Sequence, residues 1–331
     1  MSAGTDATSP SEGTLERTLT LEVVRVTEAA AIACYDWIGR GDNVAADQAA
    51  VDAMRRALNE CGIRGKVVIG EGERDEAPML FIGEEVGTQE GPRVDIALDP
   101  LEGTSLTAKA APNALAVLAM AEGGSLLHAP DVYMDKIAIG GGYPAGLVDL
   151  DADPKDNIGA LAKAKGVPTE EVTACILERD RHNDLIEKVR STGARVILIP
   201  DGDVAGVIHT TDDATGIDIY MGIGGAPEGV LAAAALRCIG GQMQGRLLFR
   251  NDEERGRATR IGLTDFDKKY DMTDLASGDV MFAATGVTTG SLLEGIKIGG
   301  GFVTTHTIVM RSKTGTVRWV KTRHRSASKP L

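Results

Sequence analysis

Apolar and polar positions alternate along this chain in a way that predicts many short strands, each ended by a polar turn. In the segment 94–98, apolar residues run up to Asp99 and Pro100, and proline stops a strand. We expect further strands at residues 66–69, 137–139, 172–177, 196–199, 217–221, 280–285 and 302–310. The last of these predicts a hairpin with residues 316–320, because the segment between them, 313–315, ends in glycine.

Helical spacing of apolar residues appears in other segments. The segment 15–39 predicts an amphipathic helix, and further helices are expected at residues 51–58, 184–192 and 230–238. The pattern leaves two segments open: residues 114–121 fit a buried strand or helix, and residues 250–260 fit a charged helix or loop. Glycines are many, at 41, and aromatic residues make up only 4% of the chain. This combination favours an α/β fold with tight turns between strands and helices over a β-sandwich.

Polar segments divide the chain. Residues 1–14 are rich in Ser, Thr, Gly and Asp, which predicts a disordered N-terminus. Residues 149–171 are polar with one short helical stretch, so we place a boundary there. The predicted organisation is a metal-binding domain over residues 15–165 and a substrate-binding domain over residues 166–325, and we expect the basic residues after 320 to form a frayed surface end.

The charge and cysteine content exclude several kinds of protein. The chain of 331 residues has 35 basic and 48 acidic side chains, a formal net charge of −13, which argues against a nucleic-acid partner. The same charge repels a phosphorylated substrate, so such a site needs local cations. Four cysteines lie far apart, which predicts reduced thiols and a cytoplasmic protein. No apolar run reaches membrane-spanning length, and the first residues do not resemble a signal peptide.

Two strands end in carboxylates, which suggests a metal site. Asp99 and Glu102 lie three residues apart after the first of these strands, followed by Gly103 and Thr104. Carboxylates bind hard divalent cations, and free backbone N–H groups at a helix start bind anions, so this turn suits a metal-bound phosphate. The strand at 66–69 likewise leads into Glu71. Open α/β sheets build ligand sites at the carboxyl ends of their strands.

The later strand exits also carry charge. Arg179 and Arg181 are candidates for gripping a phosphate, although a solvated loop would carry the same residues. Asp201 and Asp203 are candidates for binding sugar hydroxyls. The glycine-rich segment 222–229 leads into a helix with Glu228 near its start. Asp47 stands near the start of another predicted helix, where an acid can also simply complement the helix dipole. The glycines at 140–142 are interpreted as a turn rather than a dinucleotide site.

Several of these strings together resemble one family. The turn Asp-Pro-Leu-Glu-Gly-Thr at 99–104 resembles the core motif of the metal-dependent, lithium-sensitive sugar and inositol phosphatases. Further strings narrow the resemblance to class II fructose-1,6-bisphosphatases, namely Gly-Arg-Gly-Asp at 39–42, Ile-Gly-Glu-Gly-Glu at 69–73, Ala-Pro-Met-Leu at 77–80, Ile-Pro-Asp-Gly-Asp at 199–203 and Gly-Ile-Gly-Gly-Ala-Pro-Glu-Gly at 222–229. The similarity extends from about Leu21 to Arg318 and keeps the family's order.

The resemblance implies a layered αβαβα sandwich with its site between two domains. It also implies two or more divalent ions, Mn²⁺ or Mg²⁺, with Asp47 and Glu71 as ligands of one ion and Asp99, Glu102 and Glu228 as ligands of another. The positions that match substrate-binding residues are Glu102, Gly103, Thr104, Tyr133, Arg179, Asp180, Arg181, Asp201, Gly202, Asp203 and Gly225. The expected partners are a small sugar bisphosphate and further copies of the chain in a dimer or tetramer, with neither nucleic acid nor membrane.

Two positions depart from the family pattern. The family usually has lysine where this chain has Asn43, and the loop Arg179-Asp180-Arg181 keeps both cations but adds an acid between them.

The expected activity is hydrolysis of the 1-phosphate of fructose 1,6-bisphosphate, with sedoheptulose 1,7-bisphosphate as a further candidate substrate. Glu71, Asp99 and Thr104 are the expected catalytic residues, with Glu71 or Asp75 as a base and Thr104 orienting the attacking water. Two alternatives stay open at this point: an inositol or sugar monophosphatase, and a non-catalytic protein that binds metal or phosphate.

Overall fold

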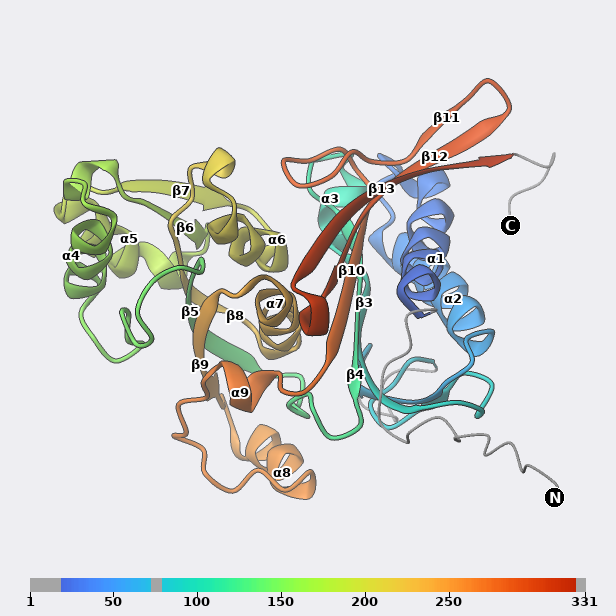
Figure 1. Cartoon of the computed structure of the whole chain (residues 1–331), viewed down its shortest axis with the longest axis horizontal. Coiled ribbons are helices and arrows are strands. Elements are labelled where there is room, and N and C mark those ends of the chain that lie inside the picture. The colour runs from blue at the N-terminus through green and yellow to red at the C-terminus, as the bar shows by residue number, and fades with distance from the viewer. Residues whose placement is uncertain (1–18, 73–78, 326–331) are drawn as a thin grey trace, which may run out of the picture.

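Two mixed β-sheets and three layers of helices alternate through the molecule (Figure 1). The computed structural model describes residues 19–72 and 79–325. The predicted disorder of residues 1–14, and the predicted role of Asp75 as a base, concern residues outside these ranges.

The larger sheet has eight strands in the order β11-β12-β10-β4-β3-β1-β2, with β13 paired to β12. Its strands are β1 (Arg64–Ile69), β2 (Glu85–Val86), β3 (Arg93–Glu102), β4 (Leu115–Glu122), β10 (Val280–Gly286), β11 (Lys297–Gly299), β12 (Phe302–Arg311) and β13 (Thr316–Arg325). Only β1 and β3 run parallel among these pairs. The register between β3 and β4 shifts between Asp99 and Glu102, so the acidic turn lies on an irregularity of the sheet.

The smaller sheet has five strands in the order β7-β6-β8-β5-β9. They are β5 (Tyr133–Ile139), β6 (Thr173–Leu177), β7 (Arg195–Ile199), β8 (Ile219–Gly225) and β9 (Gln242–Leu248). β6 runs parallel to β7 and β8, whereas β5 runs antiparallel to β8 and β9. The parallel strands β6, β7 and β8 therefore end at one edge of this sheet, where their charged exits follow.

Helices cover both faces of each sheet. Apolar residues of α1 (Leu19–Ala33) and α2 (Asn43–Asn59) pack on the outer face of the larger sheet, and α4 (Pro154–Lys165) and α5 (Asn183–Ser191) pack on the outer face of the smaller one. Between the sheets lie α6 (Asp203–Ile208) and α7 (Ala226–Ile239). The predicted αβαβα layering is confirmed. The shorter helices are α3 (Thr104–Ala108), α8 (Asp252–Arg260) and α9 (Met272–Leu275).

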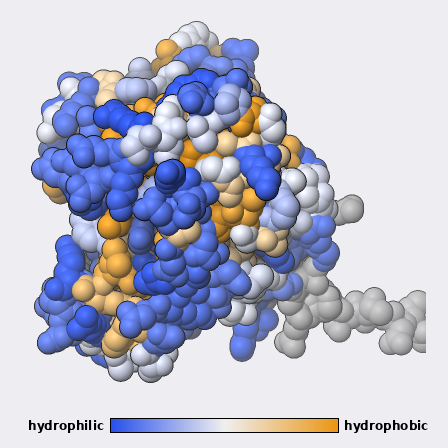
Figure 2. Space-filling model, turned by 90° about the vertical axis from the view of Figure 1, so that its left-hand side faces the viewer, coloured by the Kyte–Doolittle hydropathy of each residue, from blue (hydrophilic) through white to orange (hydrophobic). Residues whose placement is uncertain are grey.

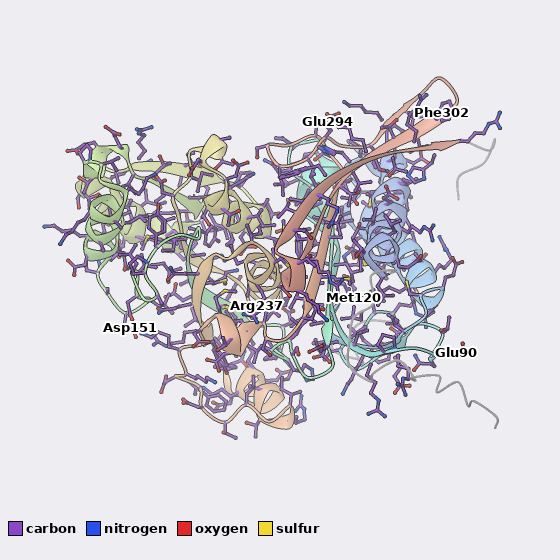
Figure 3. All side chains as sticks on the ribbon, viewed as in Figure 1. Glu90, Met120, Asp151, Arg237, Glu294 and Phe302 are labelled. Carbon is purple, nitrogen blue, oxygen red and sulfur yellow. The ribbon has the colours of Figure 1, made fainter. Side chains whose placement is uncertain are left out.

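The central helix α7 is buried on all sides because its side chains are small. Ala232 to Ala235 are at most 1% exposed, and a helix that is apolar all round belongs in an interior. Alanines let both sheets approach this helix closely. Side chains fill the remaining space between the layers, as they do around the fully buried Met120 of β4 (Figure 3).

The face that carries α4 and α5 is largely hydrophilic (Figure 2). Within residues 19–72 and 79–325, none of the helices combines the length and the apolar character that crossing a membrane requires.

The structure decides the two segments that the sequence left open. Residues 115–122 form a strand, β4, and residues 252–260 form a helix, α8. The basic residues at 321–325 belong to β13 and pair with β12, so the prediction of a frayed end is wrong for them. Long basic side chains stay in solvent while the backbone completes the sheet. β9 had no predicted counterpart, because four of its seven residues are polar or glycine.

The predicted division near residue 165 does not separate the two sheets. β5 lies before that point but belongs to the smaller sheet, and β10 to β13 lie after it but complete the larger one. The division of the chain into two domains near residue 165 stays a prediction.

Candidate active site

The turn at 99–104 is built by the end of β3 and the start of α3. The main-chain N–H of Leu101 donates to Asp99 Oδ1 over 3.0 Å, which fixes the first carboxylate. Gly103 has a φ of 86°, in the left-handed region that favours glycine. A Cβ at this position would also lie 2.8 Å from Leu106 Cδ1. Glycine therefore sets the sharp change of direction between the end of β3, which carries Asp99 and Glu102, and the start of α3.

Two hydrogen bonds join this turn to the start of α6. Glu102 Oε1 accepts a bond from the main-chain N–H of Val204 over 2.9 Å, and Ser105 Oγ donates to Asp201 Oδ2 over 3.1 Å. Glu102 is only 4% exposed and Asp203 only 5%. The structure thus brings two predicted site segments together that are about a hundred residues apart in the chain.

The predicted metal-binding acids come from separate elements but act on one another electrostatically. Asp47 lies on α2, Glu71 follows β1, and Glu228 lies in the first turn of α7. Burial raises the pKa of Asp99 well above its ordinary value, and the charges of Glu71, Glu102, Glu228 and Asp47 raise it further. Mutual influence of this kind is typical of buried carboxylates that share one region of a protein.

The same cause shifts the neighbouring carboxyl groups. Burial, and then the charges of Asp47 and Glu228, raises the pKa of Glu71 to about 8. Burial raises the pKa of Glu228 to about 7, with the charge of Asp203 adding to the shift. Uncompensated carboxylates therefore gather here, an arrangement typical of sites that bind cations or exchange protons.

The donor chemistry of this cluster fits a hard divalent cation. Glu102 Oε2 and Glu228 Oε2 are buried and have no hydrogen-bond partner among the described residues. Buried carboxylate oxygens without a partner are costly unless a cation binds them. Within residues 19–72 and 79–325, however, no three carboxylate, imidazole or thiol side chains already have the spacing of a complete metal site. The acids thus supply suitable ligands without forming a finished coordination shell.

Asp47 lies beyond the first turn of α2, which begins at Asn43. Asp42 caps that helix by accepting a bond from the main-chain N–H of Ala45 over 2.9 Å. Complementing the helix dipole is therefore a poor explanation for Asp47, because the dipole effect fades after the first turn. Asn43, where the family usually has lysine, is exposed at the start of this helix.

Lys136 is a site residue that the sequence reasoning missed. Its ammonium group is buried, forms an ion pair with Asp203, and donates to the main-chain carbonyl of Gly225 over 2.9 Å. The sequence placed the strand at 137–139, whereas β5 begins at Tyr133. Once β5 is known to begin at Tyr133, Lys136 falls on the same face of the strand as the buried residues Met134 and Ala138. A lysine at an otherwise apolar position would have pointed to a functional role.

The two arginines of the β6 exit lie apart. The guanidinium group of Arg181 donates to the carbonyl of Ile223 and lies 4.9 Å from the centre of the Tyr133 ring. The guanidinium group of Arg179 donates instead to the carbonyl of Pro200 over 2.6 Å. Arg250, which the sequence reasoning did not single out, also lies over Tyr133, at 5.1 Å. The positive charge beside Tyr133 therefore comes from Arg181 and Arg250.

His182 holds the exits of β6 and β8 together. It is 1% exposed, and its Nδ1 donates to the carbonyl of Leu177 over 2.7 Å while Nε2 accepts from the N–H of Ile223 over 2.8 Å. These two hydrogen bonds hold the backbone of Ile223 in position, and the carbonyl of Ile223 accepts the hydrogen bond from Arg181.

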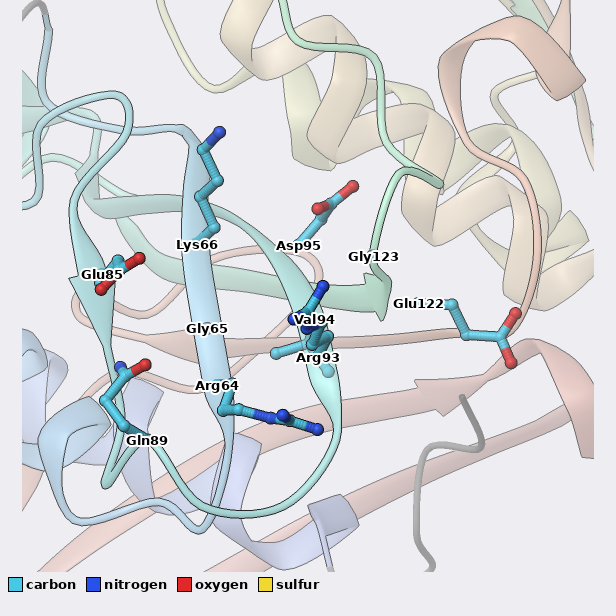
Figure 4. Close-up of a pocket in the computed structure, with 10 residues that line it drawn as sticks. All are labelled: Arg64, Gly65, Lys66, Glu85, Gln89, Arg93, Val94, Asp95, Glu122 and Gly123. Carbon is cyan, nitrogen blue, oxygen red and sulfur yellow. The ribbon is translucent and has the colours of Figure 1, made fainter. Parts of the chain in front are cut away.

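A cavity of about 910 Å³ lies elsewhere, at the amino-terminal halves of β1 and β3 (Figure 4). Its lining mixes Arg64, Lys66 and Arg93 with Glu85 and Asp95. None of the predicted site residues lines it. We therefore place the candidate site at the acids and not at this cavity.

Comparisons with known proteins agree on one family. The family model for bacterial, glpX-encoded fructose-1,6-bisphosphatase matches residues 17–324. The chain is 45% identical to the D-fructose 1,6-bisphosphatase class 2/sedoheptulose 1,7-bisphosphatase of Synechococcus sp. (strain JA-3-3Ab), covering 94% of this chain and 96% of that protein. It is 47% identical to the fructose-1,6-bisphosphatase 1 class 2 of Escherichia coli (strain K12), with the same coverage.

Proposed function

Because this chain belongs to the bacterial, glpX-encoded fructose-1,6-bisphosphatase family, we propose that it hydrolyses fructose 1,6-bisphosphate to fructose 6-phosphate and phosphate. The chain is a phosphatase of the class 2 type. The observation that carries the proposal is the family match over residues 17–324, which includes every acid of the cluster. A related protein bears the name of a dual bisphosphatase, so sedoheptulose 1,7-bisphosphate is the second substrate that we propose.

The carboxylates are proposed to hold divalent cations, Mn²⁺ or Mg²⁺. Asp47 and Glu71 would hold one ion, and Asp99, Glu102 and Glu228 another. Such ions, when bound, supply charge neutralisation on the phosphoryl oxygens and a lower pKa for water. The unpartnered oxygens of Glu102 and Glu228 support this role, because they are acceptors without a donor.

The remaining groups orient the ester for attack by water. The Thr104 hydroxyl is proposed to orient the attacking water, and Glu71 to accept its proton, while the N–H groups after Gly103 bind phosphoryl oxygens. As the new P–O bond forms, the bond from phosphorus to the O1 oxygen of the sugar breaks, and that oxygen takes up a proton. Asp201 and Asp203 would bind sugar hydroxyls, with Gly202 setting the turn between them.

The second phosphate is proposed to bind beside Tyr133. Arg181 supplies a charge there in a fixed position, because the Ile223 carbonyl already holds its guanidinium group. Asp180 and Gly225 complete the predicted substrate contacts. Holding the non-reacting phosphate positions the sugar so that the 1-phosphate meets the acids.

A substrate and metal panel tests the proposal. Phosphate release is expected from fructose 1,6-bisphosphate with Mn²⁺ or Mg²⁺, with much less from inositol phosphate and none after chelation. Asp99→Ala is expected to abolish release while circular dichroism stays that of the wild type. Release that survives chelation, or full activity in Asp99→Ala, would remove the acids from the mechanism.

We further propose that the protein works in the cytoplasm as a homo-oligomer. Light scattering on the purified chain tests the second point, and a monomer at the enzyme concentration of the assay contradicts it.

A further inference from the structure

Lys136 is a buried charge that the proposed mechanism does not use. Its side chain is 1% exposed, and that of its ion-pair partner Asp203 is 7% exposed. Three polar contacts meet at this point. Lys136 Nζ contacts Asp203 Oδ2, it donates to the carbonyl of Gly225 over 2.9 Å, and the Tyr220 hydroxyl reaches Asp203 Oδ2 at 3.5 Å.

The backbone around this ion pair leaves no spare room. A Cβ at Gly224 would lie 2.2 Å from Asp203 Oδ2 and 2.8 Å from Lys136 Nζ. The glycine-rich end of β8 therefore permits β8 to approach the pair. One ammonium group thus joins three elements: β5, the start of α6, and the junction of β8 with α7.

Burial of an ion pair is a poor way to gain stability. The cost of removing two charges from water commonly offsets their attraction, and well-packed apolar residues often serve a core equally well. Lys136 lies between Met134 and Ala138 on an apolar face, where leucine or methionine would fit the pattern. A role in geometry explains the lysine better than a role in stability.

The Asp203 carboxylate needs a positive charge beside it to stay in its buried position near the other acids. Its charge raises the pKa of both Glu102 and Glu228, so it repels, and is repelled by, the neighbouring acids. Lys136 is the cation that contacts Asp203 among the described residues. Without it, this carboxylate would be driven from the position in which it can meet a sugar hydroxyl.

We propose that Lys136 is a positioning residue that holds the Asp203 carboxylate and the Gly225 carbonyl in fixed relation for binding of the sugar. This inference rests on the proposed function, in which Asp203 and Gly225 contact the substrate. Among the described residues, Lys136 makes no hydrogen bond or ion pair with the metal-binding acids, and it acts on Glu228 only through its charge, which lowers the pKa of that carboxyl. Its loss should therefore weaken sugar binding more than it slows the chemical step.

The test compares Lys136→Met with a matched loss of a buried cation. Arg311→Met is the control, because Arg311 pairs with Asp279 over 3.0 Å at 7% and 8% exposure but lies on β12, away from the acids. Lys136→Met is expected to raise KM for fructose 1,6-bisphosphate about tenfold or more, with kcat falling about threefold or less. Calorimetry with fructose 6-phosphate and Mn²⁺ should give the same loss of affinity. The control should lose thermal stability and keep both constants.

If Lys136→Met fails to fold, Lys136→Met/Asp203→Asn replaces it, since a neutral pair leaves no unpaired buried charge. That variant should fold and bind fructose 6-phosphate about tenfold more weakly than Asp203→Asn alone, because Lys136 also holds the Gly225 carbonyl. Sugar affinity within twofold of the wild type in the folded variant overturns the inference. A fall in kcat without a rise in KM in Lys136→Met also overturns the inference. If the wild type releases no phosphate, the proposed function fails, and the binding measurement still decides the role of Lys136.

Discussion

The main-chain N–H of Val204 donates a hydrogen bond to Glu102 Oε1 over 2.9 Å, so a predicted metal ligand of the larger sheet also anchors the helix between the sheets. One oxygen of Glu102 is engaged in this bond, and the other, Oε2, has no partner among the described residues. The carboxylate therefore has one structural oxygen and one that is available to a cation.

Because the two oxygens of Glu102 differ in their contacts, two substitutions of this residue should give different results. Glu102→Gln keeps an acceptor for Val204, so the free energy of unfolding should stay close to that of the wild type while metal affinity falls. Glu102→Ala should also destabilise the metal-free protein by about 1–3 kcal/mol, because a buried N–H is left without a partner. Urea unfolding and a Mn²⁺ titration of activity measure the two effects. Equal stability of the two variants would contradict the structural role.

The raised pKa values of the acids predict how stability of the metal-free protein depends on pH. Glu71, with a pKa of about 8, and Glu228, with a pKa of about 7, hold protons in the folded state that the unfolded chain releases near 4.5. The folded state thus binds more protons between pH 5 and 8, so stability falls as pH rises through this window. The loss should be on the order of a few kcal/mol.

Thermal unfolding of the chelated protein at intervals from pH 5 to 9 measures this dependence. Excess Mn²⁺ is the comparison, because cation binding favours the ionised acids and competes with protons. The melting temperature should then rise with pH instead of falling. A chelated protein whose melting temperature is flat or rises from pH 5 to 8 would show that these acids are not buried together.

The lack of a side chain at Gly225 is expected to be required for metal binding, because it leaves room for the Glu228 carboxylate. A Cβ at Gly225 would lie 1.8 Å from Glu228 Oε2, although its backbone, at φ −67° and ψ 146°, accepts any residue. Gly225→Ala should therefore displace the Glu228 carboxylate and raise the Mn²⁺ concentration for half-maximal activity about 10- to 100-fold.

Gly159→Ala is the matched control for this substitution. A Cβ at Gly159 meets nothing within 4 Å, and the residue lies inside α4. It should stabilise the protein by up to about 1 kcal/mol without changing the metal requirement. If Gly225→Ala has the same metal requirement as Gly159→Ala, Glu228 is not a ligand.

Arg181 and Arg179 should differ in their effect on the second phosphate. Arg181→Met is expected to raise KM for fructose 1,6-bisphosphate about 10- to 100-fold, because the Arg181 guanidinium group lies beside Tyr133, where the second phosphate is proposed to bind. This range corresponds to the loss of one charge-assisted hydrogen bond. Arg179→Met should change it by less than about threefold, since its group is held at the Pro200 carbonyl. A substrate with only the 1-phosphate serves as the control, and both variants should hydrolyse it equally. Equal losses on the bisphosphate would contradict this assignment.

Local patterns were sufficient to predict most strands, and they also singled out the candidate acids, whose role stays a prediction. The apolar run before Asp99 and the turn at Gly103 are properties of neighbouring residues, and glycine acts through short-range sterics. The predicted end of the strand at Pro100 is wrong, because β3 continues to Glu102 across the irregularity in its pairing with β4. The hairpin of β12 and β13 follows from the same kind of local signal. Patterns failed where polar residues occupy a strand, as in β9, and where a strand begins earlier than its apolar run, as at Tyr133.

The sequence by itself therefore determined most of the strands, the α/β class and the candidate acids, because these depend on residues close together in the chain, whereas the layering was implied by the family resemblance. Only the tertiary structure decided which distant groups meet. It joined Glu102 to Val204, paired Lys136 with Asp203, and separated Arg179 from Arg181. These relationships depend on sheet register and on the close approach that glycine and alanine permit, and neither can be deduced from the order of residues in a single segment.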